Sequence, residues 1–486
     1  MRWLLTALAA WLAVDVLLLW PFVGRTDAVA WGVWPLLAGG LVWGVGWTAR
    51  GMSDRVGVRT IAVCAAVALA LLLLGGEGRM FHANLDWRVR DAVLRDMAIH
   101  PWSYAYTARG LPEMLRAPLG MYLLPALAMK AGGQAVGDWA LLAQNALLLT
   151  IVLALGATLF DGARRRATAL AVFIAFSGLD VVGAWLATLQ TGAPLADHLE
   201  SWASPLQFSS HVTQIFWVPQ HALAGWIGAI GFALWRDRGL PLGPFLALVP
   251  LTVLWSPLGA IGVLPFAAVA GAIALARGQV RIVDAALPAL ACVLMIPALL
   301  YLSADAAAVG AKAAPLSANV YLAFEALEAA PLLLIAFWAA RRRNLGRATL
   351  AAIAAMLLLL PLGQVGFASD FVMRASIAPL ALLALMVADA VATVRGGRLA
   401  IALAVLGLGA VTGAHEVRRA ILFPRSPPPL CSFFSAWGPG PASQKSTYLA
   451  AVARLPAPIR PDRVALVPPR DPERCWNGRW PVPTGA

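Results

Sequence analysis

The sequence has little charge: Asp, Glu, Lys and Arg together make up only 13% of its 486 residues. An ordinary soluble domain carries roughly 25% charged residues, so this composition argues against a water-soluble globular fold. Hydrophobic residues make up 60% of the chain. They recur in runs of about 17–25 residues, the length that a helix needs to cross the hydrocarbon of a bilayer. We therefore predict an all-α membrane protein that crosses its membrane many times.

Cysteine is also scarce, with four in the chain, and no Cys-x-x-Cys or Cys/His metal-ligand spacing is present. This absence argues against a zinc or iron–sulfur site. Cys64 and Cys292 fall inside apolar runs, where a small buried side chain is the simplest interpretation. Cys431 and Cys475 flank a proline-rich tail that we place in an oxidising compartment, and we predict a disulfide between them. Two unpaired thiols are the alternative.

The apolar runs predict thirteen transmembrane helices, with boundaries uncertain by several residues. They cover residues 3–22, 29–48, 60–76, 139–160, 168–187, 214–235, 240–256, 258–276, 282–302, 322–340, 348–363, 375–394 and 399–414. The first run is interpreted as a retained span and not as a signal peptide, because it lacks a clear cleavage site. Residues 119–129 are apolar but too few to span, so we expect them to lie along the interface or to dip into it.

Arginines cluster between alternate spans, which predicts a cytoplasmic N-terminus by the positive-inside rule. The inner clusters contain Arg2, Arg50, Arg55, Arg59, Arg164–Arg166, Arg236, Arg238, Arg277, Arg281, Arg341–Arg343, Arg347, Arg395 and Arg398. The net charge of +13 is thus explained by membrane anchoring, and we expect no nucleic-acid partner. All polar-rich loops then fall on the outer face. We predict a bundle over residues 1–414, with an acidic outer loop at 77–138, and an extracytoplasmic proline-rich cap over 415–486.

The outer loop at 77–138 has the densest mixture of acids, arginines and aromatic residues. Asp86, Asp91 and Asp96 alternate there with arginines at helical spacing. One interpretation is an amphipathic surface helix whose charges are solvated and form weak i,i+4 pairs. The functional interpretation places Asp86 at the mouth of a cavity, where a carboxylate can take a proton from a sugar hydroxyl or hold a divalent cation.

The region 188–221 is rich in histidine and amide side chains. His211, Gln214, Gln220 and His221 are predicted to hydrogen-bond a substrate, because unpartnered polar groups are costly in an apolar span. Ordinary loop and helix-end roles are the alternative. No pair of histidines has the spacing of metal ligands on one element, so we predict no metal site in this region, and the divalent cation at the acidic loop stays an open alternative.

Arg374 opens a span from the outer side, against the charge rule, and its guanidinium would donate a fork of hydrogen bonds to phosphate oxygens. The alternative is an i,i+4 pair with Asp370 and no further role. Arg109 and Arg116 are weaker phosphate-binding candidates of the same kind.

These residues resemble a known family. The order of several segments resembles the first outer region of the GT-C superfamily of polyprenyl-phosphate-sugar-dependent glycosyltransferases. These segments are a span, then Asp86, a helix through Asp96, the segment Ala117–Tyr122 and the basic loop Arg164–Arg166. The chain is also similar to bacterial multi-spanning proteins of uncharacterised function in its Asp-Trp-x-x-x-Asp, Trp-Val-Pro-Gln-His and Asp-Phe-x-Met-Arg segments. The resemblance implies a GT-C-like bundle and assigns Asp86 as the catalytic base. It also implies that Asp91 assists the base or holds a cation, and that arginines grip the lipid phosphate.

The favoured hypothesis is an inverting glycosyltransferase of the bacterial cell membrane. It would move a sugar from a polyprenyl-phosphate donor to an envelope acceptor, with membrane lipid as its surroundings. The alternatives are a transporter or flippase of a lipid-linked or anionic solute, and a non-catalytic envelope-assembly protein.

Overall fold

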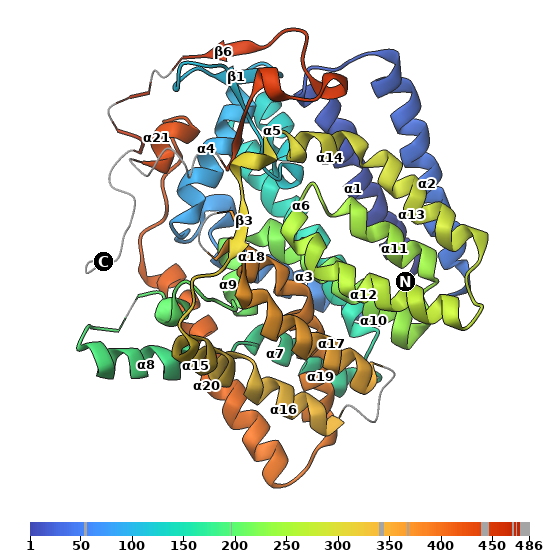
Figure 1. Ribbon diagram of the computed structural model, residues 1–486, viewed down its shortest axis with the longest axis vertical. Helices are drawn as coiled ribbons and strands as arrows, with labels where there is room; N and C mark the ends of the chain where they lie inside the picture. The colour runs from blue at the N-terminus through green and yellow to red at the C-terminus, as the bar shows by residue number, and fades with distance from the viewer. Residues whose placement is uncertain are drawn as a thin grey trace.

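The computed structural model describes residues 1–52, 56–195, 197–339, 345–366, 369–438, 447–468, 471–472 and 474–476. The chain is mostly helical (Figure 1). Most of its helices come from the apolar runs: α1 (Arg2–Phe22), α2 (Trp34–Thr48), α3 (Val58–Leu74), α6 (Gln134–Ala157), α7 (Ala163–Ala175), α8 (Asp180–Thr191), α10 (Pro219–Arg238), α11 (Leu242–Leu251), α12 (Pro257–Ala276), α13 (Ile282–Leu294), α14 (Ile296–Ser303), α15 (Ala318–Glu328), α16 (Ala330–Ala339), α17 (Gly346–Leu359), α19 (Ile377–Thr393) and α20 (Gly397–Leu422). The other α-helices are α4 (Asp86–Ile99), α5 (Gly120–Gly132), α9 (His211–Trp217), α18 (Asp370–Ala375) and α21 (Phe433–Trp437).

Among the described residues, seven helices are long and apolar enough to cross a membrane, or eight if the pair α13 and α14, bent by 50°, forms one span. Each of the thirteen predicted spans overlaps at least one helix. Four further apolar helices are shorter than the test requires: Val58–Leu74, Leu242–Leu251, Gly346–Leu362 and Ile377–Thr393. A multi-pass membrane protein fits this structure, while the total of thirteen spans stays a prediction. Arg55 and Arg341–Arg343, on which the predicted orientation partly depends, lie outside the described residues.

Two predicted elements differ from the structure in instructive ways. The predicted span at 214–235 is broken at Val218, which has φ −139° and ψ 53° and precedes Pro219. A residue before proline is disfavoured in the α region, so α9 ends there and α10 begins with the proline at its first position. The predicted tail begins at 415, but α20 continues to Leu422, close to Pro424.

The segment predicted to lie along the interface forms α5, which packs against α4 and α6. Most of its side chains are buried inside the protein, including Met121, Tyr122 and Leu123. Gln144 of α6 donates a hydrogen bond from Nε2 to the Met121 carbonyl oxygen at 2.9 Å. The helix is therefore a buried part of the bundle, and these contacts join the acidic loop to α6.

Two small sheets tie distant segments together. The first has the strand order β5 (Leu449–Ala451), β2 (Glu113–Leu115), β1 (Tyr104–Tyr106) and β6 (Ala465–Val467). β1 pairs with β6 in parallel and β2 pairs with β5 in antiparallel register, so two tail strands flank two strands of the acidic loop. Figure 1 shows β1 and β6 side by side at the top of the view, with α21 next to α4. The second sheet pairs β3 (Ala311–Ala313) with β4 (Gly363–Val365).

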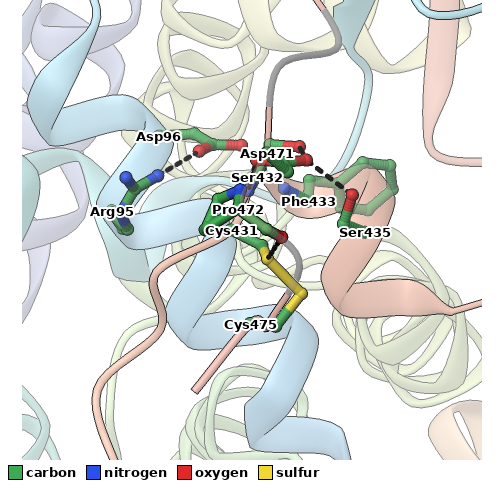
Figure 2. Close-up of a disulfide and its surroundings, with 9 residues drawn as sticks. All are labelled: Arg95, Asp96, Cys431, Ser432, Phe433, Ser435, Asp471, Pro472 and Cys475. Atoms are coloured by element: carbon green, nitrogen blue, oxygen red, sulfur yellow. Dashed lines mark hydrogen bonds and ion pairs between the residues drawn. A yellow bond between two sulfur atoms is a disulfide. The ribbon is translucent and has the colours of Figure 1, made fainter. Parts of the chain in front are cut away.

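The tail covers the end of the bundle that carries α4. Cys431 and Cys475 form a disulfide, which confirms the predicted pairing. Figure 2 shows how the bridge brings Ser432 and Ser435 to Asp471. The Ser432 hydroxyl donates to Asp471 Oδ2 at 2.6 Å, and the Ser432 N–H donates to Asp471 Oδ1 at 2.7 Å. The disulfide and these bonds hold a segment with little regular structure over α4.

Candidate functional site

A cavity of about 320 Å³ lies among α4, α9, α18 and the tail, and we call it the Asp86 cavity. Four of the predicted site residues line it: Asp86, Gln214, Asp370 and Arg374. The remaining lining residues are His198, Gln207, Ser209, Thr213, Trp217, Val218, Met373, Trp437, Thr447 and Tyr448. The structure thus brings together an acid, an arginine, amides and hydroxyls from segments that are distant in the sequence.

Asp86 is held at the cavity by the way α4 begins. The Asn84 side chain accepts a hydrogen bond from the Asp86 N–H at 3.1 Å and donates one to the Phe216 carbonyl at 2.7 Å. Trp87 Nε1 donates to the same carbonyl at 2.8 Å. These bonds anchor the first turn of α4 to the C-terminal turn of α9, so the Asp86 side chain is placed by two rigid elements.

Arg90 is the ionic partner of Asp86. Arg90 Nη2 lies 3.2 Å from Asp86 Oδ2, and Arg90 Nη1 donates to the Tyr122 hydroxyl at 3.2 Å. The Asp86 side chain keeps 44% of its surface exposed, whereas Arg90 keeps only 10%. The Asp86 carboxylate therefore has a buried cation beside it, while its side chain stays partly open to the cavity.

Asp370 and Arg374 form the facing wall. Arg374 Nη2 lies 2.9 Å from Asp370 Oδ1, and the Tyr448 hydroxyl lies 3.5 Å from Asp370 Oδ2. Burial raises the pKa of Asp370, and the neighbouring Arg374 opposes this shift. Burial lowers the pKa of Arg374, but Asp370 and Tyr448 outweigh it and raise the value above the ordinary one. Arg374 is therefore a permanent cation, and within the described structure its buried Nε has no hydrogen-bond partner.

A second cavity of about 440 Å³ adjoins the first, and we call it the His221 cavity. Asp370, Arg374, Thr447 and Tyr448 line both cavities, so these four residues form a shared wall. The other lining residues are His221, Arg116, Pro118, Pro257, Leu258, Leu302, Ala306, Ala307, Val309, Gly310, Ala311, Val365 and Gly366. The His221 cavity is thus mostly apolar, with cationic and polar groups concentrated at the shared wall.

His221 and Arg116 are placed in this second cavity by local contacts. Ser256 caps α12 by accepting a hydrogen bond from the Gly259 N–H at 2.9 Å, and its hydroxyl lies 2.8 Å from His221 Nδ1. Arg116 donates to the Thr447 carbonyl at 2.8 Å. Arg116 thereby connects the acidic loop to the tail residue that precedes Tyr448.

His198 forms another part of the Asp86 cavity wall, beside the Trp217 ring at a centroid distance of 4.7 Å. Its Nδ1 lies 3.4 Å from Glu416 Oε1 and its Nε2 lies 4.0 Å from Glu200 Oε2. Burial lowers the pKa of His198, but Glu416 and Glu200 outweigh it and raise the value. Burial also raises the pKa of Glu200 to about 7, with the nearby Asp180 adding to the shift.

Two of the four histidine and amide side chains predicted to bind substrate line neither cavity. The His211 ring lies among Phe173, Phe176 and Trp226, and its Nδ1 lies 2.7 Å from the Phe173 carbonyl. His211 therefore links α9 to α7 in the core. Gln220 is buried, and its Nε2 lies 3.5 Å from His221 Nε2. The placement of His211 departs from our expectation because α9 turns that face of the segment toward α7.

The other predicted residues outside the cavities form ion pairs. Asp91 lies 2.9 Å from Arg79, which also contacts Asp138 at 2.7 Å. Arg109 pairs with Glu113 four residues later. Burial raises the pKa of Asp91 to about 6, and Arg79 opposes this shift. The geometry gives Asp91 a part in joining α4 to α6, and Asp91 lines neither the Asp86 cavity nor the His221 cavity.

Several cavity residues were not predicted from the sequence. Gln207, Trp437, Thr447 and Tyr448 line the Asp86 cavity, and three of them belong to the tail. Tyr448 follows a proline-rich stretch that has no periodic pattern, so no local signal connects it to Asp370. Composition gives one indirect signal for Trp437 and Tyr448, because aromatic residues are unusual in a solvated tail and are expected to be buried.

No group of three or more His, Cys, Asp or Glu side chains in the described parts of the chain is arranged to hold a metal ion. The Asp86 cavity offers two carboxylates, one arginine, a tyrosine hydroxyl and the amides of Gln207 and Gln214. No family model, curated protein or solved structure matches the chain.

Proposed function

We propose that the protein is a glycosyltransferase that moves a sugar from a polyprenyl-phosphate donor to an acceptor hydroxyl. The observation that carries the proposal is that Asp86 and Arg374, which are far apart in the sequence, line one cavity. Such a transfer needs a base for the acceptor and a cation for the leaving phosphate. The GT-C-like fold and the resemblance to that superfamily belong to the same proposal.

In the proposed reaction, the Asp86 carboxylate takes the proton from the acceptor hydroxyl as its oxygen attacks the anomeric carbon. The bond between the anomeric carbon and the phosphate oxygen breaks, the sugar is transferred with inversion, and polyprenyl phosphate leaves. Arg90 and Tyr122 hold the base in place. Arg374 stabilises the negative charge on the leaving phosphate, with its buried Nε as an additional donor.

The two adjoining cavities suit a reaction between two substrates. The His221 cavity has apolar walls that fit the first isoprene units of the donor, and Arg374 lies at the shared wall. The Asp86 cavity has amides, hydroxyls and two tryptophans, which suit a sugar and its acceptor. We place this site on the outer face of a bacterial cell membrane, with the N-terminus in the cytoplasm.

The test is Asp86→Asn in protein reconstituted into nanodiscs, assayed with a panel of labelled polyprenyl-phosphate sugars. We expect sugar transfer to fall by about 10²–10⁴-fold, the usual contribution of a general base. Asp462→Asn is the matched control, because this acid lies at the same end of the protein and is 85% exposed. Undiminished transfer by a folded Asp86→Asn variant would exclude the proposed base.

A transporter of a lipid-linked or anionic solute is the second candidate, and buried acids within helices favour it. Asp180 is 1% exposed and accepts hydrogen bonds from Ser177 at 2.7 Å and Thr412 at 3.1 Å. Glu328 is also 1% exposed and accepts one from Trp202 at 3.0 Å. Movement of solute by reconstituted protein, without any sugar transfer, would favour this candidate over the enzyme.

A further inference from the structure

A third cavity, of about 330 Å³, lies at the other end of α3 and α6 from the Asp86 cavity, and we call it the Arg59 slot. Its walls come from the first half of α3, the last turns of α6 and most of the length of α7, with one residue each from α10 and α19. Since α3 ends at Leu74 and leads into the segment before Asp86, its first residues lie a helix length away from the proposed active site. The slot is therefore separate from the two cavities described above.

The slot extends from the surface of the bundle into its interior. Val63, which is 49% exposed, lies at its outer side, while Ile230 and Leu385 are 3% and 7% exposed and lie at its depth. Gly156 lies in the wall, where an added Cβ would meet Ile230 Cδ1 at 3.2 Å. The rest of the lining is almost wholly apolar and includes Val152, Leu153, Leu170 and Phe173. A flexible hydrocarbon chain fits such a slot because it can gain close contacts on all sides.

Two arginines lie at the end of the slot where α3 and α7 begin. Arg59 is exposed on the first turn of α3. Arg166, on the first turn of α7, donates from Nε to the Phe160 carbonyl at 3.0 Å, which holds its guanidinium over the slot. The described lining contains no acidic residue. The nearby Asp161 is paired with Arg238 at 2.7 Å. The end of the slot is therefore set up for an anion.

From this geometry we infer that the Arg59 slot binds an anionic phospholipid of the surrounding leaflet. One acyl chain lies along the apolar wall, and the phosphate contacts Arg59 and Arg166. Basic pockets between transmembrane helices are suited to anionic headgroups, and each arginine near the surface contributes about fivefold in affinity (about 1 kcal/mol). This inference does not depend on the proposed function, because it uses neither Asp86 nor Arg374.

Native mass spectrometry of the full chain, released from detergent with added phosphatidylglycerol or phosphatidylcholine, tests the inference. We expect wild-type protein to retain phosphatidylglycerol in preference to phosphatidylcholine. Arg59→Gln with Arg166→Gln should weaken this retention by roughly 25-fold, the product of two fivefold contributions. Gly156→Leu, which fills the slot and leaves both arginines, should also weaken it.

Arg164→Gln with Arg165→Gln is the matched control, because these exposed arginines precede Arg166 in α7 and do not line the slot. Equal losses in the two double variants would assign the binding to general basic charge and overturn the inference. Equal retention of the two phospholipids, or retention of polyprenyl phosphate alone, would also overturn it. Arg59→Lys with Arg166→Lys keeps both charges and should retain most of the binding, which separates lost affinity from a folding defect.

Discussion

Helix α4 has two differently used sides, and its acids show the contrast. Asp86 lies on the cavity side, with 44% of its side chain exposed and one ionic partner on the same helix. Asp91 and Asp96 lie on sides covered by protein, with side chains 7% and 0% exposed. Asp91 joins Arg79, while Asp96 accepts hydrogen bonds from Tyr106 at 2.5 Å and from the Phe433 N–H at 2.8 Å. Acids of one chemical type are thus either left open to a cavity or paired within the protein, depending on what covers them.

The sharpest test of the contrast compares Arg374 with Arg109. Each forms an i,i+4 pair with an acid, but Arg374 lines the Asp86 and His221 cavities and Arg109 lines neither. We expect Arg374→Gln to lower sugar transfer by about 10²–10³-fold, because a preorganised donor to the leaving phosphate is lost. Arg109→Gln should change transfer by less than twofold. Equal effects of the two variants, measured as kcat/KM, would remove the distinction between cavity and structural arginines.

Removing the disulfide between Cys431 and Cys475 tests how far the tail stabilises the end of the bundle that carries α4. Replacing Cys431 and Cys475 together by serine should cost about 2–4 kcal/mol, because the 44-residue separation is no longer constrained. Hydrogen exchange should then increase first in α21 and β6. Hydrogen exchange in α3 and α6 should remain unchanged. A uniform increase over the whole bundle would contradict a local role of the disulfide.

Asp91→Asn tests whether the buried acid of α4 stabilises the fold more than the exposed acid Asp86 does. The variant should lose about 2 kcal/mol of stability, less than the cost of breaking an isolated buried pair, because Arg79 keeps Asp138. Thermal unfolding in detergent should show a lower midpoint for Asp91→Asn than for Asp86→Asn. The reverse order would mean that the exposed acid, and not the buried one, supports the fold.

The last test concerns a pH dependence of stability where the tail covers α4. Burial raises the pKa of Asp96 from 3.8 to about 7, against the opposing hydrogen bonds from Phe433 and Tyr106. The folded state therefore binds this proton more tightly than the unfolded chain, and stability should fall as the pH rises from about 4 to about 7. Asp96→Asn should make the unfolding midpoint less sensitive to pH in this window. Because Asp91 and Glu200 also have raised pKa values, part of the slope should remain.

Some of the site could be predicted from the sequence. The pair of cysteines flanking the tail, the helical spacing of Asp86 and Arg90, and the pair of Asp370 and Arg374 are local patterns, and the structure contains all three contacts. His211 and Asp91 were expected near the substrate, and they lie in the core and in an ion pair instead. A polar side chain in an apolar segment needs a hydrogen-bonding or ionic partner. The sequence does not say whether that partner is the substrate or another part of the protein.

The sequence by itself determined that this chain is helical and suited to a membrane, because apolar runs of spanning length and scarce charge require lipid as a solvent. It also determined which residues can pair within one helix, since that depends on spacing alone. Only the tertiary structure decided which face of α4 meets a cavity and that Tyr448 closes it beside Arg374. The physical reason is that burial and access depend on contacts between segments hundreds of residues apart, and no local pattern encodes those contacts.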